Sequence, residues 1–423
     1  LFLFFLVSGF CSLLYQIIWL RLAFASFGVI TPVLSVVLSV FMAGLFIGTW
    51  GGGRWIGALC RRSGWPALAF YALAELAVAC GAFAVPRLFA RGEAALLNVG
   101  ASDSFSYLLR SALVISGSLF FWCVAMGATL PFMLAHLRQR GDGEEDGFSF
   151  LYLANVLGAM LGVLLTALVL VEALGLHRTL YVAAALNALV ALGAGLLAWR
   201  GRGVALAPLP DAPAAPAPPA QGGILPILFM TGFTSMAMEV VWTRAFTPVI
   251  KTQVYSFALI LFCYLLATFL GSALYRRHLR AAKVSPNGEL LAGLALSALL
   301  PLVLNDPRFN LGPGGTLISI FPFCIGLGYL TPKLVDQVSK GAAAGAGRAY
   351  AANILGSCLG PLVASYLLLP YLGVKLSLLV LVLPFLGAWL LQLGAAAGRA
   401  KRAWMGAAGL AVLALCYTGF RTY

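Results

Sequence analysis

The side chains best placed to do chemistry in this sequence are two acids inside long apolar runs. Glu239 lies in the run 224–244, with Trp242 three positions on and Thr243 four on, so all three share one face of a helix. A carboxylate beside an indole can bind an ammonium group by ion pairing and cation–π contact. Glu75 lies in the middle of YALAELAVAC, where it must be protonated, paired or facing a cavity. Both acids are candidates for binding a cation, and Glu239 also for proton coupling. The alternative for Glu239 is an ion pair with Arg244 or with an arginine of another span.

The elements that position these acids are predicted to be membrane-spanning helices. Hydrophobic residues make up 62% of the 423, charged residues 9%, and mean hydropathy is +0.98. A soluble chain of this length needs far more polar surface, and apolar runs of about 20 residues are long enough to cross a bilayer. The sequence therefore predicts an all-α polytopic membrane protein. The expected spans are 2–21, 31–50, 66–86, 110–134, 149–171, 178–198, 224–244, 254–274, 288–304, 314–334, 349–369, 374–394 and 404–420.

Internal similarity indicates a duplication. YQIIWLR at 15–21 matches MEVVWTR at 238–244, which pairs Gln16 with Glu239. LYLANVLGAMLG at 151–162 matches AYAANILGSCLG at 349–360 at a smaller offset along the chain, so the second half is shorter between its second and fifth spans. Tyr15, Gln16 and Trp19 of the first copy join Glu75, Glu239 and Trp242 as candidate binding residues.

Six spans separate the repeats, so both halves are expected to cross the membrane in the same direction. This is the arrangement of the major facilitator fold. We expect an N-terminal half at 1–200, a Pro/Ala-rich linker at 201–222, a C-terminal half at 223–396 and an additional span within 397–423. Duplication is also compatible with a purely structural scaffold.

The net charge of +14 does not indicate nucleic-acid binding, because the basic residues lie in short loops at span ends. Their bias between alternate loops predicts a cytoplasmic N-terminus. The eight cysteines are scattered without CxxC spacing, and the three histidines share no metal-ligand spacing. We therefore expect no disulfide framework, metal site or cofactor.

A second group of residues is expected to act in packing or gating. Asn155 and Asn353 occupy equivalent places beside glycines four positions apart, where helices can approach closely and an amide can bond across the contact. Pro131 and Pro332 follow Gly-containing segments near the end of the fourth span of each half, which favours a kink or a broken helix. The same group includes Arg21 and Arg244, which end the matching YQIIWLR and MEVVWTR motifs.

The motifs SGFCSLLYQIIWLR, FMAGLFIGTWGGGR, GATLPFM and LYLANVLGAMLGVLLTALVLVEALGL resemble the membrane region of bacterial spermidine synthase-like proteins. In that family a facilitator-like helical region precedes an aminopropyltransferase-type domain. The resemblance implies a bacterial inner (cytoplasmic) membrane location. Two departures are clear: the soluble synthase-like domain is absent from this sequence, and the glutamate usual in the first span is Gln16 here.

The sequence thus predicts a transporter-like domain that binds or moves a small, cationic, polyamine-like metabolite by alternating access. No nucleophile–base pair or metal cluster supports an enzyme in these residues, and aminopropyl transfer would need a domain that is not present. The alternative is a non-transporting anchor or accessory subunit of a fused enzyme or larger membrane complex. The expected partners are the lipid bilayer, the metabolite, and a soluble domain or further membrane subunits.

Overall fold

The computed structural model describes residues 1–98, 103–140, 147–200, 223–250, 253–304, 311–339, 343–393 and 409. All elements in these ranges are helices, with no strand among them. By contacts the chain divides into two compact units, Leu1–Phe233 with Val335–Leu362, and Thr234–Leu334 with Val363–Tyr423. Each unit is considered by itself below.

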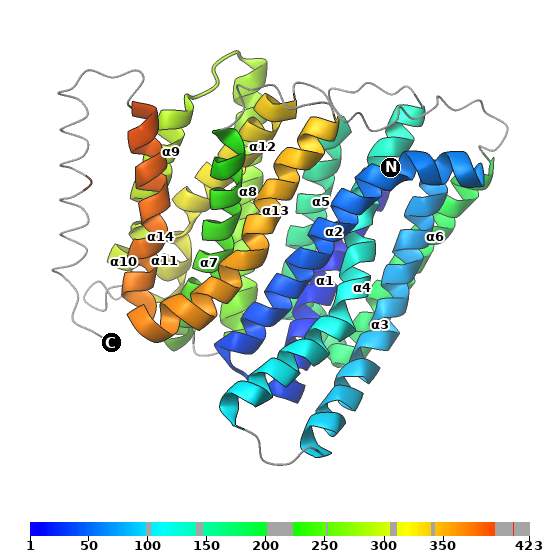
Figure 1. Cartoon of the computed structure of the whole chain (residues 1–423), viewed down its shortest axis with the longest axis horizontal. Coiled ribbons are helices and arrows are strands. Elements are labelled where there is room, and N and C mark those ends of the chain that lie inside the picture. The colour runs from blue at the N-terminus through cyan, green and yellow to red at the C-terminus, as the bar shows by residue number, and fades with distance from the viewer. Residues whose placement is uncertain are drawn as a thin grey trace. The chain divides into compact units, whose positions relative to one another are not determined.

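The N-terminal part of the first unit contains α1 (Phe2–Phe27), α2 (Thr31–Ser63), α3 (Ala67–Asn98), α4 (Ser104–Gln139), α5 (Gly147–Leu165), the π-helical η1 (Thr166–Leu170) and α6 (Val171–Arg200). Here α1 packs against α5 and α6, α2 against α4, and α3 against α4 and α6 (Figure 1). The helices therefore share one interior rather than lying in separate pairs.

Local sequence explains several helix ends in this part of the chain. Pro32 lies in the first turn of α2, where its missing N–H costs no hydrogen bond, and Gly64 ends that helix with φ 70°. Asp103 caps α4 by accepting a hydrogen bond from the Ser106 backbone N–H at 3.1 Å. Hydrogen bonds from Ser106 also hold the pKa of the exposed Asp103 carboxyl below its usual value.

The remaining described helices are α7 (Ile224–Ile250), α8 (Gln253–Arg280), α9 (Asn287–Ser297), α10 (Leu300–Leu304), α11 (Gly312–Ile318), α12 (Phe321–Ser339), α13 (Ala343–Val363), the π-helical η4 (Ala364–Leu368) and α14 (Leu369–Leu393). The predicted single spans 288–304 and 314–334 are each interrupted: α9 gives way to α10, and α11 to α12. Pro301 in the second position of α10 and Pro322 in that of α12 fit these restarts, because proline is favoured in a first helical turn.

Ten helical stretches within the described residues are long and apolar enough to cross a membrane. Two of them, Leu151–Arg200 and Ala349–Leu390, have 50 and 42 residues. At about 1.5 Å per residue each is about twice the length needed for a hydrocarbon core of about 30 Å. Each is therefore long enough for two crossings, as the predicted pairs of spans at 149–171 with 178–198 and at 349–369 with 374–394 require.

A glycine turns the chain inside each of these two long stretches. Gly175 has φ 75° and ψ 174°, and Gly373 has φ 69° and ψ −179°, a combination open almost only to glycine. Thr179 Oγ1 donates to the Gly175 carbonyl at 2.7 Å, and Ser377 Oγ donates to the Gly373 carbonyl at 2.5 Å. A π-helical segment precedes both turns, η1 and η4, so the same local device occurs in both copies.

Close helix contacts are repeated in the same register. A Cβ added to Gly158 would collide with the Leu6 carbonyl oxygen, where α5 crosses α1. A Cβ added to Gly356 would collide with the Phe229 carbonyl oxygen, where α13 crosses α7. Leu6 and Phe229 are separated by the same number of positions as the motifs YQIIWLR and MEVVWTR. The two glycines are separated by the same number of positions as the motifs LYLANVLGAMLG and AYAANILGSCLG, as the sequence predicts. Only glycine permits this backbone-to-backbone approach.

The contact of α2 with α4 likewise recurs between α8 and α12. Thr49 Oγ1 donates to the Gly127 carbonyl at 3.0 Å, and Ser272 Oγ donates to the Gly328 carbonyl at 2.9 Å. Thr49 and Ser272 are separated by the same number of positions as the motifs YQIIWLR and MEVVWTR. The separation of Gly127 and Gly328 is smaller and is already close to that of the second motif pair. Most of the shortening of the second copy therefore lies between its second and fourth spans, where 18 residues at Asn287–Leu304 replace the 32 of α3.

The structure thus confirms the predicted all-α polytopic membrane fold. The linker 201–222 lies outside the described residues, as does the thirteenth span 404–420 apart from residue 409, so both stay predictions. The domain boundaries at 1–200, 223–396 and 397–423 also stay predictions.

Candidate functional site

Glu75 lies at the centre of a polar cluster in the first unit. It is fully buried on α3, and its Oε2 accepts a hydrogen bond of 2.5 Å from Asn187 Nδ2 of α6. The hydroxyls of Ser8 on α1 and Tyr71 on α3 also lie beside the carboxyl group. The Tyr71 hydroxyl makes no hydrogen bond of regular geometry among the described residues. We call Ser8, Tyr71, Glu75 and Asn187 the Glu75 cluster.

Three predicted binding residues lie on α1, and one of them, Tyr15, lies near this cluster. Tyr15 and Trp19 are completely buried and stack on each other with ring centroids 5.0 Å apart. Tyr15 lies within electrostatic range of Glu75, so the structure brings these two predicted residues together. Gln16, which follows Tyr15 on the same helix, is also buried.

Glu239 and Trp242 lie in the second unit, on α7. Glu239 is 1% exposed, and its Oε1 has no hydrogen-bond partner within the described ranges. Tyr264 of α8 and Cys324 of α12 lie within electrostatic range of this carboxyl group. Thr243 Oγ1 donates to the Glu239 backbone carbonyl at 2.8 Å, so its hydroxyl is engaged by the helix itself.

Trp242 packs into an aromatic group. Its ring meets Phe323 of α12 edge-on at 5.9 Å, and Phe323 meets Phe385 of α14 edge-on at 5.5 Å. Phe385 of α14 corresponds to Asn187 of α6, at the same offset that relates Gly373 to Gly175. The second copy therefore has an aromatic ring where the first has the amide that binds Glu75.

The ion pair of Glu239 with Arg244 that the sequence left open is not formed among the described residues. Arg244 is exposed, whereas Glu239 is buried. Arg21, the equivalent of Arg244, is partly buried near the end of α1. Neither Glu75 nor Glu239 has a lysine, arginine or histidine within ion-pair distance in the part of the chain that the structure describes.

The predicted packing residues occupy equivalent helix contacts. Asn353 Nδ2 donates to the Leu228 carbonyl at 3.0 Å and to Thr231 Oγ1 at 3.1 Å, which joins α13 to α7. Asn155 lies against Gly9 at the corresponding contact of α5 with α1. Both amides thus lie at helix contacts, and their packing role stays a prediction.

Pro131 and Pro332 lie inside α4 and α12, and both helices continue through them. They keep the offset that relates Gly127 to Gly328 and are hence equivalent. A helix broken at either proline, one of the two forms expected, is therefore wrong, because the helix extends on both sides of each. A kink at these positions stays a prediction. The side chain of Pro131 packs against Gly52 of α2.

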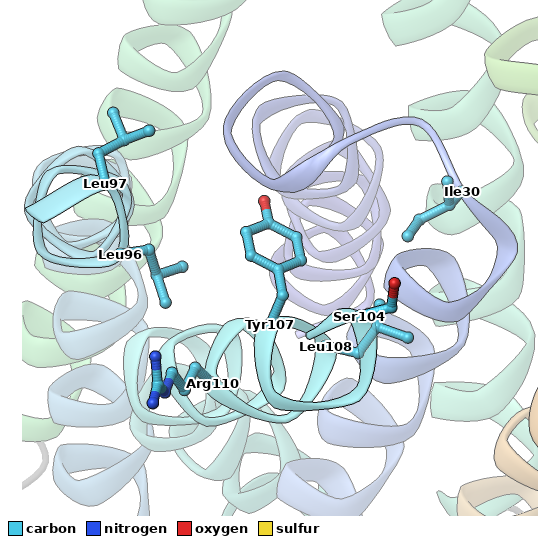
Figure 2. Close-up of a pocket in the computed structure, with 7 residues that line it drawn as sticks. All are labelled: Ile30, Leu96, Leu97, Ser104, Tyr107, Leu108 and Arg110. Carbon is cyan, nitrogen blue, oxygen red and sulfur yellow. The ribbon is translucent and has the colours of Figure 1, made fainter. Parts of the chain in front are cut away.

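A cleft of about 560 Å³ opens at the end of the first unit where α4 begins. Figure 2 shows Tyr107 of α4 between Leu96 of α3 and Ile30, the residue before α2, with Arg110 at one side. The Tyr107 hydroxyl donates to the Phe27 carbonyl at 3.4 Å. None of the predicted binding residues lines this cleft, so it includes neither buried acid.

The sequence did not indicate which side chains surround the two acids. Asn187 lies 112 residues from Glu75, and Tyr264 and Cys324 belong to other helices than Glu239. A signal for Asn187 was present, since it is a lone amide inside the apolar run YVAAALNALVALGA. Within the described residues no group of three His, Cys, Asp or Glu side chains could hold a metal ion.

The sequence matches no protein-family model and no curated protein. Solved structures of similar architecture were found at low sequence identity. A mutant of the nucleoside transporter NupG is 14% identical, with 97% of this chain and 99% of that chain aligned at a TM-score of 0.56. A POT family transporter in complex with 5-aminolevulinic acid is 14% identical over 92% of this chain and 94% of that chain, with a TM-score of 0.61.

The human organic anion transporter MFSD10 (TETRAN) is 17% identical over 92% of this chain and 97% of that chain, with a TM-score of 0.53. Structural similarity at this low sequence identity supports the fold alone. Together with the helices and their repeated contacts, it establishes a multi-pass membrane protein of the major-facilitator-like fold.

Proposed function

We propose that this chain is a membrane transporter that carries a small organic cation, with polyamine-like compounds as the first candidates. The observation that carries the proposal is Glu239, a buried acid without a basic partner among the described residues, one helical turn from Trp242. Alternating access would expose this carboxylate to each side of the membrane in turn.

The structural neighbours support transport of a solute. They are transporters of nucleosides, peptides and organic anions, and their folds align with nearly the whole of this chain. Their named substrates differ from one another, so they support the class of activity and not the choice of substrate.

The proposed charge of the substrate rests on the chemistry of Glu239. A carboxylate at membrane depth is costly unless a proton or a cation neutralises it, and a substrate ammonium group can do so. The indole of Trp242 would add a cation–π contact to that group once bound. In the first copy the equivalent residue is Gln16, so the duplication offers one such carboxylate and not a symmetric pair.

The proposed location rests on the distribution of basic residues and on the family resemblance. We propose a bacterial inner-membrane protein with a cytoplasmic N-terminus, because lysine and arginine favour the loops on that side. A soluble synthase-like domain or other membrane subunits would be its partners. The alternative function, a non-transporting anchor, is tested by the same experiment.

Equilibrium binding of labelled spermidine and putrescine to the chain in lipid nanodiscs tests the proposal. We expect saturable binding that weakens at least about tenfold in Glu239→Gln, equivalent to about 1.4 kcal/mol. The matched control is Glu172→Gln, which removes a carboxyl group from an exposed position. Binding that is equal in wild type and Glu239→Gln, or absent from both, would overturn the assignment.

A panel of a nucleoside, a dipeptide and an organic anion should be run beside the polyamines. If one of these binds more tightly than either polyamine, the substrate is not a cation. If none of the panel binds, the anchor function is favoured.

A further inference from the structure

The buried Glu75 cluster has features that substrate binding at Glu239 does not explain. Its members come from three helices of the first unit, α1, α3 and α6, and Glu239 belongs to the other unit. Glu75 is held at Oε2 by Asn187, whereas its buried Oε1 makes no hydrogen bond of regular geometry among the described residues, with the hydroxyls of Ser8 and Tyr71 beside the carboxyl group. Asn187 Oδ1 and the Tyr71 hydroxyl are also buried and also make no hydrogen bond of regular geometry among the described residues.

No positive charge accompanies Glu75 in the described part of the chain. The titratable groups that face it are Cys11 and Tyr15 of α1 and Tyr71 of α3, all neutral when protonated. Neither α4 nor α6, which also pack against α3, contributes a titratable group to its surroundings in the described ranges. An ionised carboxylate without a counter-ion is strongly disfavoured at membrane depth.

The amide of Asn187 can serve both protonation states of this carboxyl group. Its Nδ2 donates to an ionised Glu75, and after the amide turns over its Oδ1 accepts the O–H of a protonated Glu75. The two amide orientations occupy nearly the same space, so the exchange needs no movement of the helices. A carboxyl group with such a partner can gain or lose a proton without leaving a buried donor facing another donor.

A metal cation fits this place less well than a proton. Even with its amide turned over, Asn187 offers one oxygen, Oδ1, beside the two of Glu75 and the hydroxyls of Ser8 and Tyr71. The backbone carbonyls of α3 and α6 around Glu75 and Asn187 are engaged within continuous helices. Too few oxygen atoms then remain for the roughly six ligands of a hard cation.

We propose that Glu75 is a proton-binding site inside the first helical bundle, with Asn187 as the side chain that accommodates the protonated and ionised forms. The site is distinct from Glu239 and does not rest on the proposed transport function. If the chain carries a solute, a proton taken up and released here is available for coupling.

Infrared difference spectroscopy of the lipid-reconstituted chain during a pH titration tests this directly. A protonated buried carboxyl group gives a C=O stretching band that disappears on ionisation. We expect one component of that band to be missing in Glu75→Gln and present in Glu239→Gln and in the exposed control Glu172→Gln. In Asn187→Leu the component should persist but shift in frequency, because the carboxyl group has lost its amide partner.

The proposal is overturned if Glu75→Gln leaves the protonated-carboxyl band unchanged throughout the titration. It is also overturned if adding Na⁺ at constant pH removes the Glu75 component, since that would mark a sodium site. Substitution of Glu75 by glutamine keeps its size and one acceptor, and circular dichroism of each variant verifies folding. The measurement needs no substrate, so it stands apart from the binding test of Glu239.

Discussion

The two copies share a packing frame but differ in the chemistry of their interiors. In the first unit, α1, α3 and α6 enclose the Glu75–Asn187 hydrogen bond. In the second unit, α7, α12 and α14 enclose the aromatic contacts of Trp242, Phe323 and Phe385. The acid of the second copy, Glu239, stands instead where the first copy has Gln16.

This difference separates what the duplication must retain from what it can change. The glycine contacts, the hydroxyl-to-carbonyl bonds and the turns at Gly175 and Gly373 recur because backbone geometry tolerates little else there. The buried acids and the amide of Asn187 do not recur. Since a buried polar group in a membrane helix is costly, those that remain in one copy only are the ones for which a function is expected.

The largest effect should come from giving the second copy the amide of the first. Phe385→Asn removes a fully buried ring and leaves an amide without a polar partner in an aromatic interior. We expect a loss of about 3–5 kcal/mol of stability, measured by thermal unfolding in detergent. Phe385→Leu, which keeps the site apolar, is the control and should lose less. Equal losses in both would show that polarity does not distinguish the two interiors.

A medium effect is expected where the copies agree. Gly158→Ala and Gly356→Ala each place a Cβ against a carbonyl oxygen of a crossing helix, so both should lose about 1–3 kcal/mol. Gly117→Ala adds a Cβ in open space and should be neutral in the same unfolding assay. If only one of the two contact glycines is sensitive, the shared packing frame is wrong at the other.

The smallest effect concerns the equivalent hydroxyl bonds. Thr49→Val and Ser272→Ala each remove one donor to a glycine carbonyl between neighbouring helices. Such bonds contribute about 0.6 kcal/mol on average in membrane proteins, so the two variants should shift the melting temperature slightly and by similar amounts. Thr179→Val, which removes a bond to the turn at Gly175, offers a comparison within one copy. A large shift in only one of the matched pair would contradict the equivalence of the two contacts.

Much of the fold could be predicted because its signals are local or repeated. Apolar length predicts the first twelve spans, and two matched motifs predict the duplication and its register. The breaks between α9 and α10 and between α11 and α12 were not predicted, since they lie in stretches whose mean hydropathy still fits a single span. The π-helical segments leave no composition signal at all.

The candidate site was predicted less completely. Glu75 and Glu239 stand out because charges inside apolar runs are rare, and the structure finds both buried. Their surroundings depend on which helices meet, and a single sequence does not specify that. For this reason Asn187 was not identified as the partner of Glu75, and the ion pair considered for Glu239 is not formed within the described residues.

The central claim is that the chain moves a cationic solute by means of Glu239. Uptake of labelled spermidine into proteoliposomes, with empty liposomes as the blank and Glu172→Gln as the matched variant, tests it most directly. We predict saturable, time-dependent uptake by wild type and by Glu172→Gln, and loss of most of that uptake in Glu239→Gln. Wild-type uptake no greater than that of empty liposomes, or full uptake by Glu239→Gln, would contradict the claim.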